Sequence, residues 1–170
     1  MSDPIADAFI MASRLRMRES FEKITHCINQ LPDSDLAWRP FEQANSITNI
    51  VLHLCGNLRQ WVIHAAGEAP DVRNRPLEFS DRSAIPKAEL IERLRKTVEE
   101  ADQAISHLSP DELTKPRRVQ GFEVNKLAAI FDSIAHLQGH TQEIIYITRL
   151  RIGDKYKFKW VPHGKEQGGQ

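Results

Sequence analysis

Hydrophobic residues recur at the three- and four-residue spacing of an α-helix in four long segments, which polar, proline-containing stretches separate. The last of these segments is apolar on more than one face, which predicts that it is the most buried. The predicted helices run from Asp3-Pro4 to Leu31, from a Ser46 cap to about Ala66, from Pro86 to Leu108, and from Glu123 or Asn125 to about Ile152.

The connections between these helices differ in length. Residues 32–40 (PDSDLAWRP) are dense in turn formers, and residues 109–112 (SPDE) have the chemistry of a capping box before a short extra turn. Residues 67–85 predict no long regular element, but they are numerous enough to cross the molecule. The expected fold class is therefore all-α: a four-helix bundle with a long crossover between its second and third helices.

The end of the chain differs from the rest. We expect residues 1–153 to form a single four-helix-bundle domain and residues 154–170 to form a C-terminal tail. Apolar and basic residues alternate from Tyr156 to Trp160, so this part of the tail is expected to lie extended against the bundle or a second subunit. Residues 165–170 are expected to be disordered.

Composition and charge narrow the class of protein. The chain has 170 residues, of which 41% are hydrophobic and 27% charged, and this suits one compact domain. The 23 basic and 23 acidic residues balance, which removes any broad attraction to nucleic acid or anionic lipid. No apolar run approaches the roughly 20 residues of a membrane helix, and no signal-peptide pattern begins the chain. We therefore expect a cytoplasmic protein in which Cys27 and Cys55 are reduced core thiols.

Candidate chemistry centres on three histidines. His136 and His140 lie one helical turn apart, so their rings can converge on a point beside the fourth helix. His53, on the second helix, belongs to a polar seam at the edge of an apolar face. Buried imidazoles need partners, and a divalent ion on these three residues would supply one and leave open positions for water or substrate.

The polar residues around these histidines are candidates for hydrogen-bonding the ligands or lining a pocket. His64 would serve as a spare ligand or general base, and Glu143 would orient the ring of His140 or act as a base. The full set of such candidates is Asn57, Gln60, His64 and Glu143. Spacing alone also fits plainer alternatives, in which the histidines hydrogen-bond one another and Asn57, and Glu143 forms a salt bridge.

Three segments, SITNIVLHLCGNLRQW, RNRPLEF and IAHLQGHTQEIIYITR, resemble the DinB-like superfamily, and an uncharacterised branch of it in particular, over about residues 5–152. The resemblance implies an up-down-down-up bundle, usually a homodimer, that holds nickel, zinc or a related divalent ion on His53, His136 and His140. It also implies a reaction class, because characterised members are thiol-dependent transferases or isomerases that use low-molecular-weight thiols such as bacillithiol or mycothiol.

Three hypotheses about function follow. In the first, the chain is a divalent-metal-dependent enzyme, a thiol-dependent S-transferase or a related hydrolase or isomerase, acting on a small-molecule substrate between the second and fourth helices. Trp38, Arg39, Asn57 and Arg59 are the candidates for lining that cleft. In the second, the chain is a noncatalytic stress-linked or dimerising bundle with a structural or vestigial ion. In the third, the histidines bind no metal.

Overall fold

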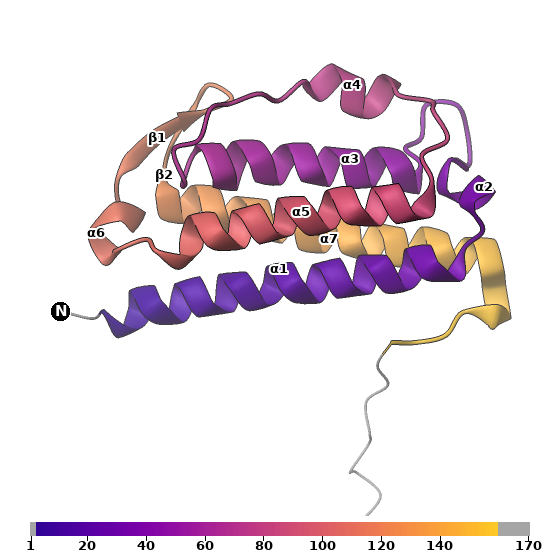
Figure 1. Ribbon diagram of the computed structural model, residues 1–170, viewed down its shortest axis with the longest axis horizontal. Helices are drawn as coiled ribbons and strands as arrows, with labels where there is room; N and C mark the ends of the chain where they lie inside the picture. The colour runs from indigo at the N-terminus through magenta and orange to yellow at the C-terminus, as the bar shows by residue number, and fades with distance from the viewer. Residues whose placement is uncertain (1–2, 160–170) are drawn as a thin grey trace, which may run out of the picture.

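Four long helices form the body of the protein, and the computed structural model describes residues 3–159. The helices α1 and α3 each contact both α5 and α7, so α1 and α3 lie across a diagonal of the bundle. In Figure 1, α1 and α7 run from left to right, and α3 and α5 run from right to left. The bounds of the long helices are α1 (Pro4–Gln30), α3 (Ile47–Leu58), α5 (Lys87–Ser106) and α7 (Lys126–Ile152).

Polar caps set the ends of the two helices that matter most for the site. The Ser46 hydroxyl accepts a hydrogen bond from the Asn49 backbone amide at the start of α3, and the two residues form a capping box. The Asn125 side chain likewise accepts from the Ala128 amide at the start of α7. Gly153 ends α7 with a positive φ of 54°, a conformation that glycine adopts at low cost. These ends agree with those predicted from the sequence.

The second predicted helix is not α-helical over its whole length. α3 ends at Leu58, and the chain continues as a π-helix, η1 (Arg59–His64). The Ala65 amide donates to the carbonyl oxygen of Gln60, five residues earlier, at 3.1 Å. The expected α-helical continuation to Ala66 is therefore wrong in its last turns, because the hydrophobic pattern of a wider turn resembles that of an α-helix.

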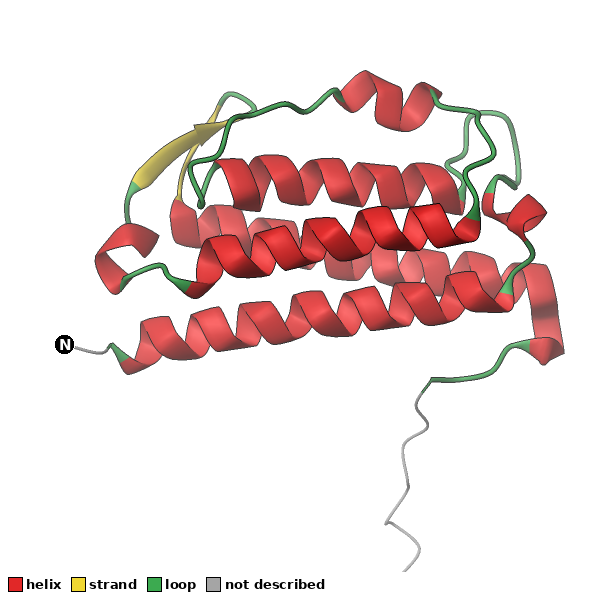
Figure 2. Cartoon of the chain, in the orientation of Figure 1, coloured by secondary structure: helices red, strands yellow, loops and turns green. Residues whose placement is uncertain are grey.

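A β-hairpin corrects the all-α expectation. β1 (Pro116–Val119) pairs antiparallel with β2 (Phe122–Asn125), directly before α7, and is drawn in yellow in Figure 2. The two residues of the turn, Gln120 and Gly121, have φ of 51° and 86°, which is the backbone of a tight hairpin turn. The protein is thus mostly helical, with one small two-stranded sheet among the residues described.

Short helices occupy the connections. The crossover between η1 and α5 contains α4, which packs on α3 and lies along the top of the bundle in Figure 1. The connection between α1 and α3 and the connection between α5 and β1 each contain a single turn of helix, and a 3-10 turn follows α7. These elements are α2 (Asp33–Leu36), α4 (Arg75–Ser80), α6 (Pro110–Leu113) and η2 (Gly153–Lys155).

The most buried long helix is α3 rather than α7. Eight of the 12 residues of α3 are buried, against ten of the 27 residues of α7. Phe131, Tyr146 and Leu150 of α7 are exposed, so the expectation that this helix is the most buried is wrong.

Cys27 and Cys55 are free thiols, and burial raises the pKa of both, that of Cys55 to about 11.

The described part of the tail lies against α1. The Lys157 amide donates to Gln30 Oε1 at 2.7 Å, and the Lys157 carbonyl oxygen accepts from Gln30 Nε2 at 3.2 Å and from the His26 ring at 2.6 Å. Residues 160–170, including His163 and the segment expected to be disordered, lie outside the described residues. Within residues 3–159, no helix has the length and apolar character needed to cross a membrane.

Candidate metal centre

Three imidazoles from two helices converge at one point. His53 projects from α3, and His136 and His140 project from α7, with one nitrogen of each ring within 4.8 Å of the others. The Nε2 atoms of His53 and His136 are 2.8 Å apart. The ring centroids of His136 and His140 are 4.5 Å apart, and those of His53 and His140 are 5.2 Å apart. Two ring nitrogens as close as those of His53 and His136 share either a proton or an ion.

The two helices are tied together next to this cluster. Ser133, one turn before His136 on α7, donates its hydroxyl hydrogen to Asn57 Oδ1 of α3 at 2.7 Å. Ser133 and Ala129 are both small and buried, so α3 can approach α7 closely here. Close packing of α3 on α7 therefore helps to bring the histidines together.

Two of the three imidazoles have a carboxylate on Nδ1. The Nδ1 of His53 donates to Glu78 Oε2 at 2.9 Å, and the Nδ1 of His140 donates to Glu143 Oε2 at 2.6 Å. A carboxylate on Nδ1 fixes the tautomer and leaves the Nε2 lone pair for a metal ion. The ring orientations of His53 and His140 thus suit Nε2 ligation.

The carboxylate of Glu78 is itself held by an arginine. Arg73 donates through Nε to Oε1 at 2.7 Å and through a terminal nitrogen to Oε2 at 2.9 Å. The same terminal nitrogen lies 3.2 Å from His53 Nδ1, and the other terminal nitrogen donates to Gln60 Oε1 at 2.9 Å. The side chains of Arg73 and Glu78 are only 2% and 8% exposed. Such a bidentate pair fixes the carboxylate in one geometry.

Sequence analysis missed both Arg73 and Glu78. They lie in and just before α4, in a crossover expected to contain no long regular element. The segment RNRPLEF, which contains both residues, was noted only for its family resemblance, and Pro76 was a local signal because proline favours the first turn of a helix. That signal marks a short helix, but it does not tell where the helix packs.

A glycine on α3 makes room for this carboxylate. A Cβ atom on Gly56 would overlap Oε1 of Glu78 and would lie 2.7 Å from its carboxyl carbon and 3.0 Å from Arg73 Nε. Any larger residue at position 56 would therefore push Glu78 away from His53.

Burial keeps two of the three rings in the form that binds metals. Burial lowers the pKa of His136 to about 4, with further lowering from the neighbouring His140 and His53. Burial also lowers the pKa of His53, although Glu78 opposes this change. Both rings are consequently neutral near pH 7, and a neutral imidazole is the form that ligates a metal ion.

The other predicted pocket residues separate into two groups. Asn57 lies beside the histidines, whereas Gln60 contacts Arg73 and also accepts from Gln120 Nε2 at 2.5 Å. His64 lies away from the cluster, and its Nδ1 donates to the Ala69 carbonyl oxygen at 2.6 Å. His64 therefore secures the start of the crossover.

Three residues expected to line the cleft contact other parts of the protein. Arg59 pairs with Glu100 of α5 at 2.7 Å, and Arg39 donates to Asn49 Oδ1 at 3.0 Å. Trp38 packs against the core, with the guanidinium of Arg151 4.6 Å from its ring centroid. None of these three residues lines the cavity beside the histidines, so the expectation that they do is wrong.

A cavity of about 250 Å³ adjoins two of the histidines. Its walls come from α3, η1, the crossover, the tip of the hairpin and α7, so five segments contribute to it. The lining residues are His53, Asn57, Trp61, Arg73, Arg75, Gln120, Asp132, Ser133 and His136. The cluster therefore faces a space that a small molecule can enter.

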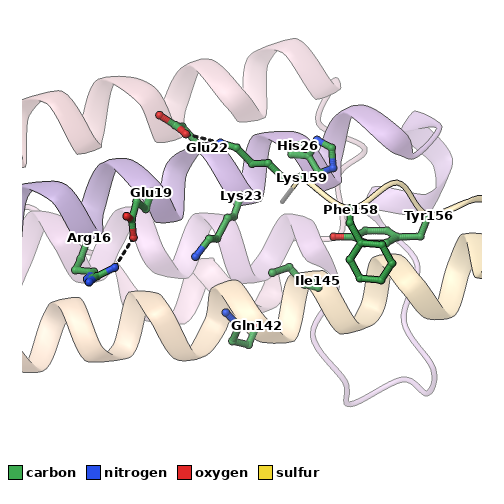
Figure 3. Close-up of a pocket in the computed structure, with 10 residues that line it drawn as sticks. All are labelled: Arg16, Glu19, Glu22, Lys23, His26, Gln142, Ile145, Tyr156, Phe158 and Lys159. Carbon is green, nitrogen blue, oxygen red and sulfur yellow. Dashed lines mark hydrogen bonds and ion pairs between the residues drawn. The ribbon is translucent and has the colours of Figure 1, made fainter. Parts of the chain in front are cut away.

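A larger cavity, of about 830 Å³, lies between α1, α7 and the tail, and Figure 3 shows its lining. Arg16 pairs with Glu19 there, and Glu22 pairs with Lys159. Among residues 3–159, the cavity shares no lining residue with the histidine cluster, and His26 is the one histidine that lines it and binds the tail backbone. We place the candidate site at the smaller cavity because convergent ligand atoms, rather than volume, indicate chemistry.

The donor set fits a divalent transition metal. Three imidazoles are ligands that zinc, nickel, copper and iron accept, and three protein ligands leave positions open. The carboxylates behind His53 and His140 are the outer partners that such ligands usually have. The residues present therefore suit the ion that the resemblance implies.

Comparison with known proteins identifies the fold. A family model described as "Protein of unknown function (DUF1572)" matches residues 4–165. A conserved protein from Enterococcus faecalis has a similar structure, with a TM-score of 0.67 and 16% identity over 84% of this chain and 96% of that one. A DinB-like protein from Bacillus subtilis gives a TM-score of 0.66 and 12% identity over 86% and 96% of the two chains.

A third similar structure is a mutant of the mycothiol-dependent maleylpyruvate isomerase. Its TM-score is 0.63 and its identity 12%, over 79% of this chain and 60% of that one. No protein in the curated set matches the sequence. At these identities the three structures establish a common DinB-like fold.

Proposed function

The chain belongs to the DUF1572 family of proteins of unknown function and has a DinB-like fold, and we propose that it is a divalent-metal-dependent enzyme. His53, His136 and His140 hold the ion, with nickel or zinc as the leading candidates. The observation that carries the proposal is the convergence of three imidazoles beside a cavity of about 250 Å³. A closed coordination sphere buried in the core would instead favour a purely structural ion.

Each group around the cluster has a role in this proposal. Glu78 and Glu143 orient the rings of His53 and His140, and Trp61 forms an apolar wall of the cavity. A divalent ion at this point would lower the pKa of a thiol or a water molecule that reached it and so supply a nucleophile near neutral pH. The protein contributes the fixed geometry and a partly enclosed space.

The reaction class is a thiol-dependent transfer or isomerisation of a small molecule, or a related hydrolysis. The mycothiol-dependent isomerase among the similar structures supports a low-molecular-weight thiol as co-substrate. Both cysteines of this chain have raised pKa values because of burial, and neither lines the cavity. The nucleophilic thiol would therefore come from a second small molecule rather than from the chain.

Elemental analysis of protein purified without a histidine tag tests the metal site. We expect stoichiometric divalent metal in the wild type and much less in His53→Ala and His140→Ala. Both variants should keep their helical circular dichroism, because the hydrophobic core supplies most of the stability. Wild-type protein that stays metal-free after reloading, with its fold intact, would overturn the proposal. Unfolding of both variants would instead favour the structural ion of the noncatalytic alternative.

A thiol-consumption assay tests the transfer reaction, because a transferase consumes its thiol whereas an isomerase regenerates it. Metal-loaded protein is incubated with mycothiol, bacillithiol or glutathione and a panel of small electrophiles, and His53→Ala serves as the control. We expect thiol consumption above background with the wild type alone. Equal rates in the two proteins would remove the thiol-transfer proposal and leave the metal site to be judged by its own experiment.

We also propose that the chain forms a homodimer. α1 and α7 pack side by side, and both carry exposed apolar residues, among them Met11 and Leu15 on α1 and Leu127 and Phe131 on α7. Light scattering after gel filtration should give twice the chain mass of 19.5 kDa. Phe131→Asp should shift the protein towards the monomer, and a wild-type monomer would refute the proposal.

A further inference from the structure

The cavity next to the histidines contains two arginines with different surroundings. The guanidinium of Arg73 is occupied by Glu78 and Gln60, as described above, and Glu78 balances its charge. Arg75 is exposed and lines the same cavity. Within residues 3–159, Arg75 has no ion pair and no hydrogen bond to a carboxylate, so its N–H groups are free to bind a ligand.

An aromatic ring holds Arg75 near the histidines. The guanidinium carbon of Arg75 lies 5.0 Å from the ring centroid of Phe79. The ring of Phe79 lies in turn 4.9 Å from that of His53. Stacking uses the flat face of a guanidinium and leaves its N–H edge available, which is the edge that binds a carboxylate with two parallel hydrogen bonds.

The balance of charge in the cavity favours an anion once the metal site is filled. Asp132 is the other charged lining residue without an ion pair in the described part of the chain, and it offsets Arg75. Arg75 and Asp132 offset each other, so a divalent ion on the histidines would give the cavity a net positive charge. A volume of about 250 Å³ lies below the range typical of pockets for drug-sized ligands, so the occupant is small.

We propose that the substrate is a small organic acid whose carboxylate binds Arg75 while the rest of the molecule extends towards His53 and His136. The inference rests on the proposed metal-dependent function and adds the substrate class to it. Arg75 is a binding residue here, and Phe79 positions it. Asp132, which lines the cavity from α7, disfavours a second negative charge and so limits which acids bind well.

Isothermal titration of metal-loaded protein with succinate, and with uncharged succinamide as the comparison, tests this proposal. We expect succinate to bind more tightly than succinamide. Arg75→Gln should weaken succinate binding about 10- to 100-fold, the range for a charge-assisted pair, and Arg75→Lys should lie between the two because lysine lacks the planar fork. Asp132→Asn should tighten binding several-fold by removing repulsion.

Arg18→Gln is the matched control, because it removes the same charge from α1, which does not line the cavity. Elemental analysis after each titration separates loss of metal from loss of the anion site. The proposal is overturned if Arg75→Gln retains its metal and binds succinate like the wild type, or if succinamide binds equally well. If the wild type holds no metal at all, the metal proposal fails alone. In that case the metal-free wild type and its Arg75→Gln variant are titrated with succinate. Binding that depends on Arg75 would support the anion site, and no binding would refute the anion site.

Discussion

The two carboxylates that contact the histidine cluster differ in how the fold holds them. Glu78 reaches His53 from α4, 25 residues away in sequence, and each of the two residues is only 7% exposed. Glu143 reaches His140 from the next turn of the same helix, and its side chain is 43% exposed. One half of the site is therefore built by tertiary packing and the other half by local helix geometry.

This difference should determine how much each carboxylate contributes. A buried network such as Arg73–Glu78–His53 is expensive to break, because removing one member leaves another charged or polar group unpaired without water. An exposed pair three residues apart on one helix contributes little, because water screens it and both side chains lose freedom when they pair. Substitutions on the two sides should therefore have unequal effects on stability and on metal affinity.

The largest effect is expected from Glu78→Gln. This change leaves the guanidinium of Arg73 buried without its counter-charge, which costs about 3 kcal/mol of unfolding free energy. It also removes the anionic partner of His53 Nδ1 and should weaken metal binding about 10- to 100-fold. Urea unfolding of the metal-free protein and chelator competition of the loaded protein measure the two effects. A change below about 0.5 kcal/mol would contradict the buried-network interpretation.

A double variant separates stability from ring orientation. Arg73→Gln combined with Glu78→Gln removes both buried charges, so much of the lost stability should return. Metal affinity should stay low, because His53 still lacks its carboxylate. Recovery of both the unfolding free energy and the metal affinity would show that Glu78 affects metal binding only by stabilising the fold and not by orienting His53.

The next largest effect is expected from Gly56→Ala. The new Cβ would collide with the Glu78 carboxylate, and Arg73 and His53 restrict the direction in which that group can move. Such overpacking costs about 1–3 kcal/mol, which the helix preference of alanine offsets by up to about 1 kcal/mol. Thermal unfolding and metal affinity should both fall.

Gly139→Ala provides the control for this change. Gly139 is also a helical glycine, but nothing lies within 4 Å of its Cβ position. The substitution should stabilise the protein by up to about 1 kcal/mol and leave metal binding unchanged. Similar outcomes for the two glycines would mean that Gly56 has no special role in admitting the carboxylate.

The sequence predicted the parts of the site that depend on local rules. His136 and His140 share a helix face because of their four-residue spacing, and caps such as Ser46 and Asn125 marked where the helices begin. His53 was recognisable as a polar residue at the edge of an apolar face. These signals come from the spacing and the cap residues of a single helix, so they can be recognised without knowing which elements pack against that helix.

The parts that were missed depend on contacts between segments. Glu78 reaches His53 only because α4 folds back onto α3, and the free space at Gly56 exists only in that arrangement. The hairpin carried a weak signal, because its strands contain few apolar residues and its turn is Gln120-Gly121 rather than the stronger Asn-Gly. Tertiary packing, rather than local propensity, determines each of these features.

Glu143→Gln should have a much smaller effect than Glu78→Gln. The substitution removes an exposed partner of His140 and should change the unfolding free energy by less than about 0.5 kcal/mol. Metal affinity should fall only a few-fold, because glutamine can still accept a hydrogen bond from His140 Nδ1 in the same position. The same chelator competition measures it, and a loss equal to that of Glu78→Gln would abolish the contrast between the two halves.

The last prediction concerns the acid sensitivity of the metal-free cluster. The pKa of His136 is about 4 in the folded protein, below the ordinary value of 6.5. Between these pH values the unfolded chain binds a proton at His136 that the folded chain does not bind, so the stability of metal-free protein falls as the pH drops through this interval. His136→Gln should reduce that fall, which urea midpoints at about pH 7 and about pH 5 would measure. An identical fall in the variant and the wild type would mean that burial of His136 does not depress its affinity for protons.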